Sequence, residues 1–314
     1  MTETSNDYFF SIIIPTYNRS AFLLKTIQSF IDQEYKNFEL IIVDDGGSDN
    51  SGKVSKSFND NRINYYWKEN EERGAARNFG AKLAKGLYVN FFDSDDIAYP
   101  NHLQVAYDTI IAKKNPEIFH LGYDGKIGDK IIYRYNTFNG DILNYGIKKK
   151  RISINSLFIR KDVTQLVPFC EDRLLSVSED ALYVCQLAAR HSFHYNNIIT
   201  STIVEHDKRS MVLAPYNQLK LRRDILLENL ENDNIFMGKF GKYLKDIKKE
   251  YDYLLALSCL KTGNYVYSRK YFYSYLSFSL FSFLDIRSIV YVKKYIERLI
   301  KATNSLINTK SSRI

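Results

Sequence analysis

Three short apolar runs in the first hundred residues each end in a polar or acidic cluster. The clusters cover residues 15–19, 44–48 and 93–96. Each run is continuously apolar, which is typical of strands buried on both faces of a parallel sheet. Segments with helical spacing of apolar residues separate the runs, so we predict a parallel α/β sheet with right-handed crossovers. These crossovers bring all three clusters to one edge of the sheet, where open α/β sheets bind ligands.

The later sequence extends this pattern and then changes character. A hairpin-like segment follows over residues 125–145. After Pro215 only helical spacing occurs, so we expect an α/β domain over residues 1–214 and an all-helical extension over residues 215–314. The expected strands are residues 8–15, 38–43, 62–67, 86–92, 117–123, 152–159 and 193–204, and the expected helices are residues 23–31, 73–84, 101–114, 219–230, 238–260 and 266–283, with another that begins at Ser178.

The third cluster, Phe91-Phe92-Asp93-Ser94-Asp95-Asp96, places three carboxylates within four residues after a buried strand. Carboxylates in apolar surroundings repel one another unless a positive charge lies between them. A divalent cation is the simplest candidate, since Mg²⁺ takes oxygen ligands from carboxylates and substrate phosphates. The alternative is a solvated acidic turn with Ser94 as a cap. Because three polar clusters meet at one edge, we favour a ligand site.

Four further positions are candidates for the same site. Arg77 is predicted to lie in the first turn of a helix, where its charge opposes the helix dipole, so we expect an anionic partner for it. Glu179 and Asp180 follow Ser178 at another helix start, where acids are ordinary capping residues. His206 lies in a polar loop, where a single His usually has no special role. The residues alone leave functional and structural interpretations of Glu179, Asp180 and His206 open.

The composition is that of an ordinary globular protein. Its 314 residues are 45% hydrophobic and 25% charged, which is enough to form a large core. Three widely spaced cysteines form no zinc or redox motif and predict buried thiols in a reducing compartment. The polar, acidic start is unlike a secretory signal, and no apolar run reaches the roughly 18 residues of a membrane span. We therefore expect a cytoplasmic protein.

All of the excess positive charge lies in the last third of the chain. Residues 1–214 hold 26 Lys and Arg against 27 Asp and Glu, whereas residues 215–314 hold 18 against 9. Cations flank an uncharged aromatic stretch at residues 271–284, which is too short to span a bilayer. Residues 265–314 are therefore expected either to contact the inner face of a membrane peripherally or to pack onto the main domain as a helical pair. No nucleic-acid-binding module accompanies the basic charge, so we expect no nucleic-acid partner.

Five motifs give the chain its resemblance to a known family, the glycosyltransferases of family 2, over about residues 8–211. The motifs occur in the family's order, and they are Pro15-Thr16-Tyr17-Asn18-Arg19, Val43-Asp44-Asp45-Gly46 with Ser48, Arg73-Gly74-Ala75-Ala76-Arg77-Asn78, Asp93-Ser94-Asp95-Asp96 and Glu179-Asp180. An extra Gly47 before Ser48 departs from the family and affects the fine contacts of that loop. The resemblance implies the GT-A fold, a Rossmann-like, mostly parallel sheet flanked by helices. The helical extension matches nothing specific in the family.

The resemblance also implies roles for individual residues. Asp45 would accept a hydrogen bond from a uracil N–H, Asp93 would support the ribose or the metal, and Asp180 would be the catalytic base. Asp95 and His206 would bind Mn²⁺ or Mg²⁺. Glu179 would lie beside the base, toward the acceptor. The nucleotide-binding residues that the family implies are Pro15, Tyr17, Arg19, Asp45, Arg77, Asp93 and Ser94.

These roles imply an inverting transferase in cell-surface polysaccharide assembly. It would move a hexosyl or N-acetylhexosaminyl group from a nucleotide-sugar, expected to be a UDP-sugar, to a hydroxyl of a saccharide or lipid-linked saccharide acceptor. One carboxylate suffices to accept the proton of the attacking hydroxyl. A metal that stabilises charge on the leaving diphosphate makes a second catalytic acid unnecessary, whereas a glycosidase needs two carboxylates beside the bond.

Two alternatives stay open at this point. A sugar nucleotidyltransferase also uses acids at a sheet edge, but residues 15–20 lack the glycine-rich phosphate loop of such an enzyme. A nucleotide-sugar-binding protein without turnover would use the same scaffold, although it would not need both Asp95 and Asp180. A dehydrogenase is poorly supported, because no Gly-x-Gly-x-x-Gly follows the first strand.

Overall fold

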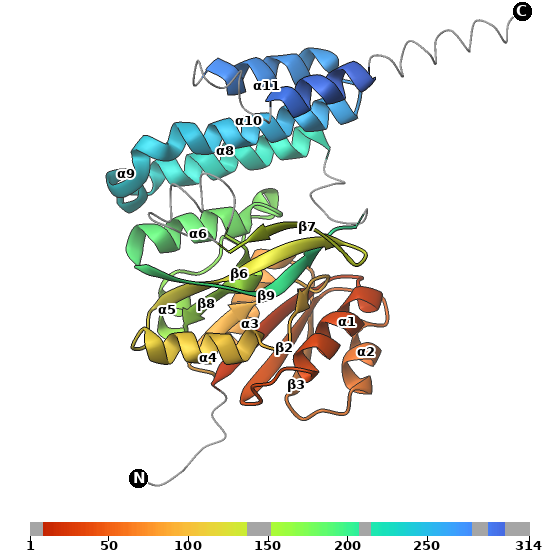
Figure 1. Ribbon diagram of the computed structural model, residues 1–314, viewed down its shortest axis with the longest axis vertical. Helices are drawn as coiled ribbons and strands as arrows, with labels where there is room; N and C mark the ends of the chain where they lie inside the picture. Colours follow the sequence, from red (N-terminus) through yellow and green to blue (C-terminus); the bar gives the residue numbers. More distant parts are fainter. Residues whose placement is uncertain (1–8, 137–151, 207–214, 278–287, 299–314) are drawn as a thin grey trace, which may run out of the picture.

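The computed structural model describes residues 9–136, 152–206, 215–277 and 288–298. In this part of the chain a nine-stranded sheet forms one body, and the C-terminal helices form a layer above it (Figure 1). The sheet order is β3-β2-β1-β4-β8-β6-β9-β5, with β7 paired to β6. The strands are β1 (Phe10–Thr16), β2 (Phe38–Asp45), β3 (Ile63–Lys68), β4 (Tyr88–Phe91), β5 (Ile97–Ala98), β6 (Ile118–Ile127), β7 (Lys130–Tyr135), β8 (Leu157–Arg160) and β9 (Phe193–Val204).

The first four strands form the parallel half of the sheet. β1 lies between β2 and β4, and β3 pairs with the outer side of β2. All residues of β1 and β2 are buried, as the apolar runs Ile12–Ile14 and Leu40–Val43 predict. Thr16 pairs with Asp44, and Asp45 pairs with Lys68, so neighbouring strands end at the same edge. The predicted meeting of the strand ends is confirmed.

The second half of the sheet is mixed rather than purely parallel. β8 lies between β4 and β6 and is antiparallel to both. β6 is parallel to β9 and antiparallel to β7 in a hairpin, and β5 is antiparallel to β9. The prediction of a mostly parallel sheet flanked by helices is confirmed. The expected strand at 152–159 is shorter than predicted, because residues Ile154–Ser156 form a 3₁₀ turn (η2) before β8 begins.

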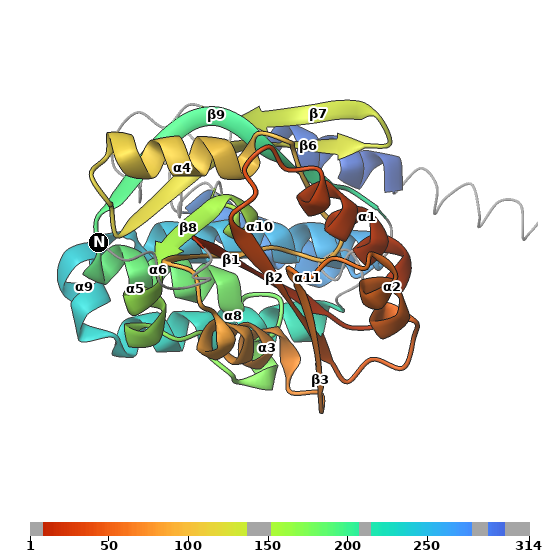
Figure 2. The same ribbon diagram turned by 90° about the horizontal axis from the view of Figure 1, so that it is seen from below.

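Helices cover both faces of the sheet (Figure 2). Alternate side chains of β1 point to opposite faces, so that Phe10, Ile12 and Ile14 join one core and Ile13 joins the other. The first core also includes side chains of α1 and α4, and the second includes side chains of α3, α5 and α6. These helices, with α2 beside α1, are α1 (Ser20–Ile31), α2 (Ser51–Ser57), α3 (Glu72–Leu83), α4 (His102–Ala112), α5 (Lys161–Leu166) and α6 (Glu179–Arg190).

The C-terminal helices pack on α6. Leu226 and Leu230 of α8 share a buried cluster with Leu182 of α6, and α10, α11 and the helical residues 288–298 share a second, aromatic cluster above it. The helical character predicted after Pro215 is therefore confirmed for the described residues. The helices are α8 (Tyr216–Asn232), α9 (Asn234–Phe240), α10 (Leu244–Lys261) and α11 (Tyr265–Ser277). No described helix is long and apolar enough to cross a bilayer.

One expected helix, residues 238–260, is wrong as a single element. Asp233 caps the earlier α9 by accepting hydrogen bonds from the N–H groups of Ile235 and Phe236. α9 then ends at Phe240, and the 3₁₀ turn Gly241–Tyr243 separates it from α10. Gly238 and Gly241 favour such a break, since glycine is a poor helix former. The predicted hairpin to residue 145 and the predicted helix to residue 283 extend into residues 137–151 and 278–287, which lie outside the described residues.

Candidate active site

A pocket of about 570 Å³ lies at the carboxyl edge of the parallel strands. Its lining includes residues from all three strand-end clusters, so the three clusters border one pocket. The sequence-predicted residues among its walls are Pro15, Tyr17, Arg19, Asp45, Asp93, Ser94 and Asp95. Arg77, Glu179, Asp180 and His206 are not part of this lining.

The loops after β1 and β2 hold each other in place. Asn18 has a positive φ of 51° and accepts a hydrogen bond from the N–H of Ser48 at 2.8 Å. The Gly47 N–H donates to Asp44 Oδ1 at 2.8 Å, and a Cβ on Gly47 would meet that oxygen at 2.5 Å. A side chain at this position would therefore have to displace either the Asp44 carboxylate or the loop, which glycine avoids.

Asp45 faces the pocket from the end of β2. Its Oδ1 accepts hydrogen bonds from Lys68 Nζ and the Glu71 N–H, both at 3.0 Å. Its Oδ2 accepts one from Asn70 Nδ2 at 3.1 Å. A carboxylate has about four acceptor positions, so Oδ2 retains capacity for a further donor. Tyr17 also lines the pocket, and its side chain is half exposed.

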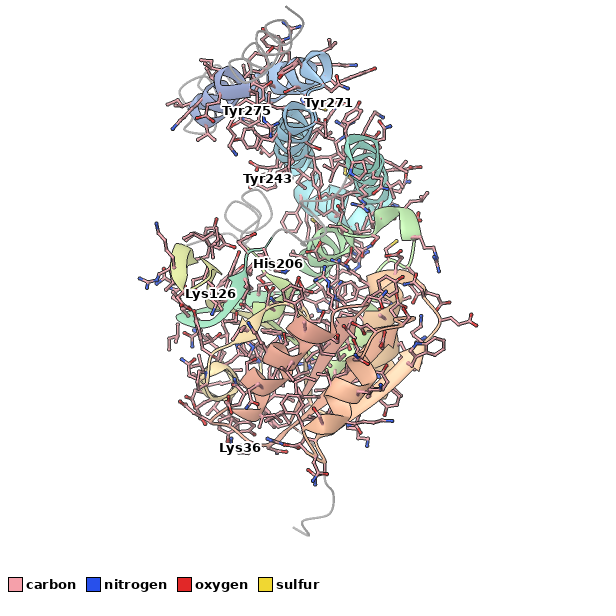
Figure 3. The ribbon with its side chains drawn as sticks, turned by 90° about the vertical axis from the view of Figure 1, so that its right-hand side faces the viewer. Lys36, Lys126, His206, Tyr243, Tyr271 and Tyr275 are labelled. Atoms are coloured by element: carbon pink, nitrogen blue, oxygen red, sulfur yellow. The ribbon has the colours of Figure 1, made fainter. Side chains whose placement is uncertain are left out.

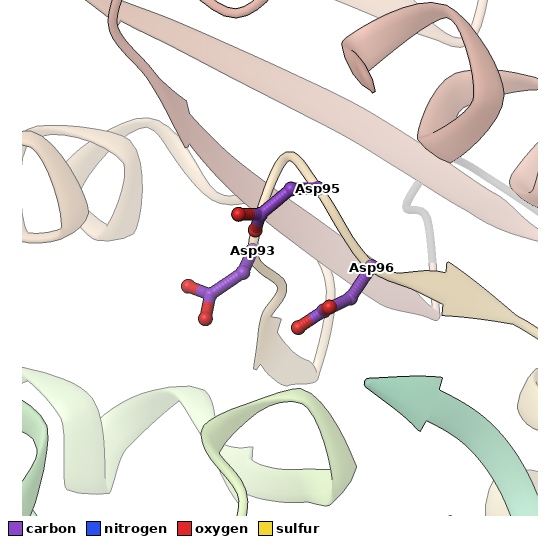
Figure 4. A group of neighbouring side chains, drawn as sticks. All are labelled: Asp93, Asp95 and Asp96. Atoms are coloured by element: carbon purple, nitrogen blue, oxygen red, sulfur yellow. The ribbon is translucent and has the colours of Figure 1, made fainter. Parts of the chain in front are cut away.

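The three aspartates after β4 do not have equal roles. All three side chains project to one side of their loop, with one oxygen of each within 4.8 Å of the others (Figure 4). Asp96 is fully buried, and its two oxygens accept hydrogen bonds from the Val204 N–H and from Asn155 Nδ2. Asp96 is thus a structural residue that fastens the loop to β9, which leaves Asp93 and Asp95 facing the pocket.

A guanidinium and an imidazole, from Arg19 and His206, contact Asp95. Its carboxylate pairs with Arg19 and lies 3.1 Å from His206 Nε2. His206 lies at the boundary between the sheet and the helical layer (Figure 3), and its ring stacks on Phe22. Its buried Nδ1 finds no hydrogen-bond partner among the described residues. Carboxylate oxygens with an imidazole nitrogen form a donor set that suits Mn²⁺, so these residues fit the metal that the sequence predicts.

Arg77 lies behind the pocket wall, where it joins two of the predicted motifs. α3 begins at Glu72, so Arg77 is in the second helical turn, and its predicted place in the first turn is wrong. Its expected anionic partners exist: Glu179 Oε1 at 2.7 Å and Asp93 Oδ1 at 3.0 Å. Burial alone would lower the pKa of Arg77, but these two carboxylates raise it above its usual value. The guanidinium therefore stays charged and links the Asp93 loop to the start of α6.

Asp180 lies beside the pocket rather than in its lining. Ser178 precedes α6 as predicted but makes no side-chain cap, whereas Asp180 Oδ1 accepts a hydrogen bond from the Ala181 N–H at 2.7 Å. Burial and the neighbouring Glu179 raise the pKa of Asp180 to about 6, and the charge of Asp93 raises it by a smaller amount. Ser176 and Val177, on the same segment, line the pocket. Asp180 is therefore electrostatically coupled to the site but separated from it by this turn.

Several residues that build the site had no signal in the sequence. Asn155 accepts a hydrogen bond from the Asp93 N–H and donates one to Asp96, so it sets the shape of the acidic loop. Ser176 donates to Glu72 at 2.7 Å across the pocket. Gln218, Leu221 and Arg222 of α8 complete the wall. These contacts depend on tertiary packing, since the residues come from separate parts of the chain.

Comparisons with known proteins agree with this geometry. A model of the family described as Glycosyl transferase family 2 matches residues 11–165. Over 140 residues the chain is 39% identical to an uncharacterized glycosyltransferase of Rickettsia conorii, which covers 44% of this chain and 23% of that protein. It is 35% identical over 130 residues to the glycosyltransferase GlyG of Streptococcus pneumoniae, covering 40% of this chain and 43% of that protein. The chain thus spans less than half the length of these relatives.

One relative has a specific description. Over 165 residues the chain is 32% identical to WfgD of Escherichia coli, a UDP-Glc:alpha-D-GlcNAc-diphosphoundecaprenol beta-1,3-glucosyltransferase, covering 52% of this chain and 64% of that protein. Two solved structures share the fold at low identity. Staphylococcus aureus TarS in complex with UDP-GlcNAc has a TM-score of 0.61 at 17% identity and covers 85% of this chain and 91% of that one. The Pyrobaculum calidifontis mannosyltransferase PcManGT in complex with GDP-Man and Mn²⁺ has a TM-score of 0.56 at 12% identity. The match covers 95% of this chain and 87% of that one.

Proposed function

This chain belongs to glycosyltransferase family 2, and from that premise we propose that it transfers a sugar from a UDP-sugar to a hydroxyl of a saccharide or lipid-linked saccharide in the assembly of a cell-surface polysaccharide. The observation that carries the proposal is the common pocket of Asp45, from the end of β2, and of Asp93 and Asp95, which follow β4. The donor in the TarS structure and the reaction of WfgD support a UDP-sugar and a bacterial glycan acceptor. A hexosyl or N-acetylhexosaminyl group fits both.

The nucleotide is proposed to occupy the wall formed by the first two strand ends. The uracil would stack on Tyr17 beside Pro15 and donate its N–H to Asp45 Oδ2, which has remaining acceptor capacity. Asp93 and Ser94 would contact the ribose, with Arg19 near the phosphates. Arg77 contributes indirectly, because its guanidinium holds Asp93 at 3.0 Å. Its role is thus to position the loop rather than to touch the nucleotide.

Asp95 and His206 are proposed to hold Mn²⁺ or Mg²⁺, with Asp93 beside them. When bound, the ion supplies positive charge for the diphosphate that leaves in the transfer. In this structure the Asp95 carboxylate pairs with the Arg19 guanidinium, so it already faces a positive charge. Asp96 already accepts hydrogen bonds from Asn155 and Val204, so it is proposed to hold the loop in place rather than to bind the ion.

Asp180 is proposed to accept the proton of the attacking hydroxyl, and Glu179 to stay paired with Arg77 beside it. A pKa of about 6 leaves Asp180 ionised at neutral pH yet more basic than an ordinary aspartate, which suits a general base. The acceptor must reach it past the turn of Ser176 and Val177. Val177 has a φ of +77°, a strained conformation for a β-branched residue, which supports this turn as the element that moves.

A screen of nucleotide-sugars tests the function. Wild-type protein is mixed with each nucleotide-sugar and Mn²⁺, and both the thermal shift and slow donor hydrolysis are recorded. We expect a shift and turnover with a UDP-sugar. Asp95→Ala should lose the Mn²⁺-dependent part of the shift, whereas Asp162→Asn, a change of an exposed carboxylate, should keep it. A shift without turnover for any donor or acceptor would instead indicate a nucleotide-sugar-binding protein.

We also propose that the C-terminal helices contact the anionic inner face of a membrane. α11 and residues 288–298 border an apolar groove of about 810 Å³. Apolar side chains are exposed on both helices, including Val266, Tyr273 and Ile289. The described residues of the two helices hold five Lys and Arg and one acidic residue, so their charge complements anionic headgroups. A membrane position would place the enzyme near a lipid-linked acceptor.

Vesicle sedimentation tests this contact. Deletion of α11 is unsuitable, because the helix buries Tyr275 and Leu276 against α10. The double variant Lys293→Glu with Lys294→Glu should release the protein from vesicles that contain phosphatidylglycerol. The matched double reversal Lys53→Glu with Lys56→Glu, on exposed positions of α2 at the other end of the molecule, should not (Figure 1). Wild-type protein that stays in the supernatant with these vesicles would contradict the proposal.

A further inference from the structure

Helix α8 forms part of the candidate active site, although it lies outside the residues that match the family model. It is held in place by Leu226 and Leu230, which pack against Leu175 and Leu182. From this position Gln218, Leu221 and Arg222 line the same pocket as Asp45 and Asp95. The pocket therefore has one wall whose chemistry the family motifs do not describe.

Arg222 is a partly buried cation in that wall with few contacts of its own. Its Nη1 is buried and has no hydrogen-bond partner among the described residues. Its Nη2 makes one long hydrogen bond, to Gln218 Oε1 at 3.4 Å. Burial, and then the nearby Arg73, lower the pKa of Arg222. Arg173 also lines the pocket, so three guanidinium groups from α3, η3 (Arg173–Leu175) and α8 face one space.

Two carboxylates, Glu72 and Glu179, favour the charged form of Arg222 from nearby, but each has another hydrogen-bond partner. Glu72 accepts a hydrogen bond from Ser176 at 2.7 Å, and Glu179 pairs with Arg77 at 2.7 Å. Neither pairs with Arg222 in the described structure. Like charges in a partly buried site are costly unless an anion lies between them. A phosphate is the anion that best matches the planar fork of a guanidinium, which can bind two oxygens at once.

We propose that Arg222, with Arg73 and Arg173, binds a phosphate group of a substrate and so makes α8 part of the substrate site. The proposal rests on the proposed function, because it takes the substrates from it. Two sources share this chemistry: the diphosphate of the donor and a phosphate carried by the acceptor. In both cases a residue of the C-terminal helices, rather than a residue of the family motifs, contributes to recognition.

The variant Arg222→Gln tests the site, with Lys220→Gln as the control. Lys220 is on the same helix and loses the same charge, but it is exposed, pairs with Asp224 and does not line the pocket. Calorimetric titrations without divalent cations measure the affinities for UDP, for uridine, and for inorganic pyrophosphate with and without saturating UDP. Circular dichroism checks that each variant is folded.

Three results are informative. A loss of about tenfold or more in UDP affinity, with uridine affinity unchanged, assigns the site to the donor diphosphate. Unchanged UDP affinity with a similar loss of pyrophosphate affinity for the UDP-loaded protein assigns it to an acceptor phosphate. Arg222→Gln affinities equal to those of Lys220→Gln for UDP and for pyrophosphate overturn the proposal. If wild-type protein binds no UDP, the proposed function fails, while pyrophosphate titration of the free protein still tests Arg222.

Discussion

Replacing Asp180 by Asn should abolish sugar transfer and at the same time stabilise the fold. The pKa of this carboxyl is raised from 3.8 to about 6, chiefly by burial and by the adjacent Glu179. A difference of about two pKa units corresponds to about 3 kcal/mol. Since the side chain is partly exposed, screening reduces this to about 1–3 kcal/mol. Asn keeps the oxygen that accepts the Ala181 N–H but has no charge, so the variant avoids this cost.

The sign of the effect depends on pH in a defined way. Between about pH 4 and 6 the folded protein holds a proton on Asp180 that the unfolded chain has released, so wild-type stability falls as the pH rises through this window. Asp180→Asn lacks this proton equilibrium. The variant should therefore equal wild type near pH 4 and exceed it by the full amount above about pH 7.

Urea denaturation of both proteins at pH 4, 6 and 8 measures the difference. Asp162→Asn is a control that should destabilise the fold rather than stabilise it. Hydrogen bonds from Arg160 lower the pKa of the exposed Asp162 carboxyl, so loss of its charge should cost stability, by less than about 1 kcal/mol. UDP affinity of Asp180→Asn should match wild type, since Asp180 does not line the pocket. A variant that is less stable than wild type at pH 8, or a difference that does not change with pH, would refute the reasoning.

Three further predictions follow from the same region. Because Asp180 must be ionised to accept a proton, kcat/KM for transfer should fall about tenfold per pH unit below about pH 6; a profile that is flat from pH 5 to 7 would exclude it as the base. Arg77→Met leaves Glu179 buried without its partner and should cost about 3–5 kcal/mol in urea denaturation, part of which Glu179→Gln restores in the same chain; a loss below about 1 kcal/mol would show that the pair is dispensable. Val177→Gly relieves a positive φ and should raise the free energy of unfolding by up to about 1 kcal/mol, whereas Val177→Ala should not; equal effects of the two variants would argue against strain.

The strand-end clusters were predictable because their position follows from local pattern and the handedness of crossovers. A continuous apolar run such as Ile12-Ile13-Ile14 specifies a buried strand, and parallel neighbours end together. An anionic partner for Arg77 was expected and exists, although Arg77 lies in the second helical turn rather than the first, and the identity of that partner was not predictable. Glu179 lies 102 residues away, and only tertiary packing brings it to 2.7 Å.

Other parts of the site have no local signal. Asn155 shapes the acidic loop from a 3₁₀ turn that the sequence pattern assigned to a strand. The insertion of β8 between β4 and β6 depends on how the sheet assembles, since no turn residue specifies it. The contribution of Arg222 required knowing which face of α8 meets the pocket. The division at residue 214 and the roles of the individual site residues stay predictions.

The position of α8 has a practical consequence for enzyme engineering. A hybrid built by grafting the first 214 residues onto the tail of a relative would exchange three pocket-facing side chains, Gln218, Leu221 and Arg222, along with the helix. If α8 binds substrate as proposed, the substrate preference of the hybrid would change even though every family motif was preserved. A junction placed after Asn232, at the end of α8, keeps the original wall intact.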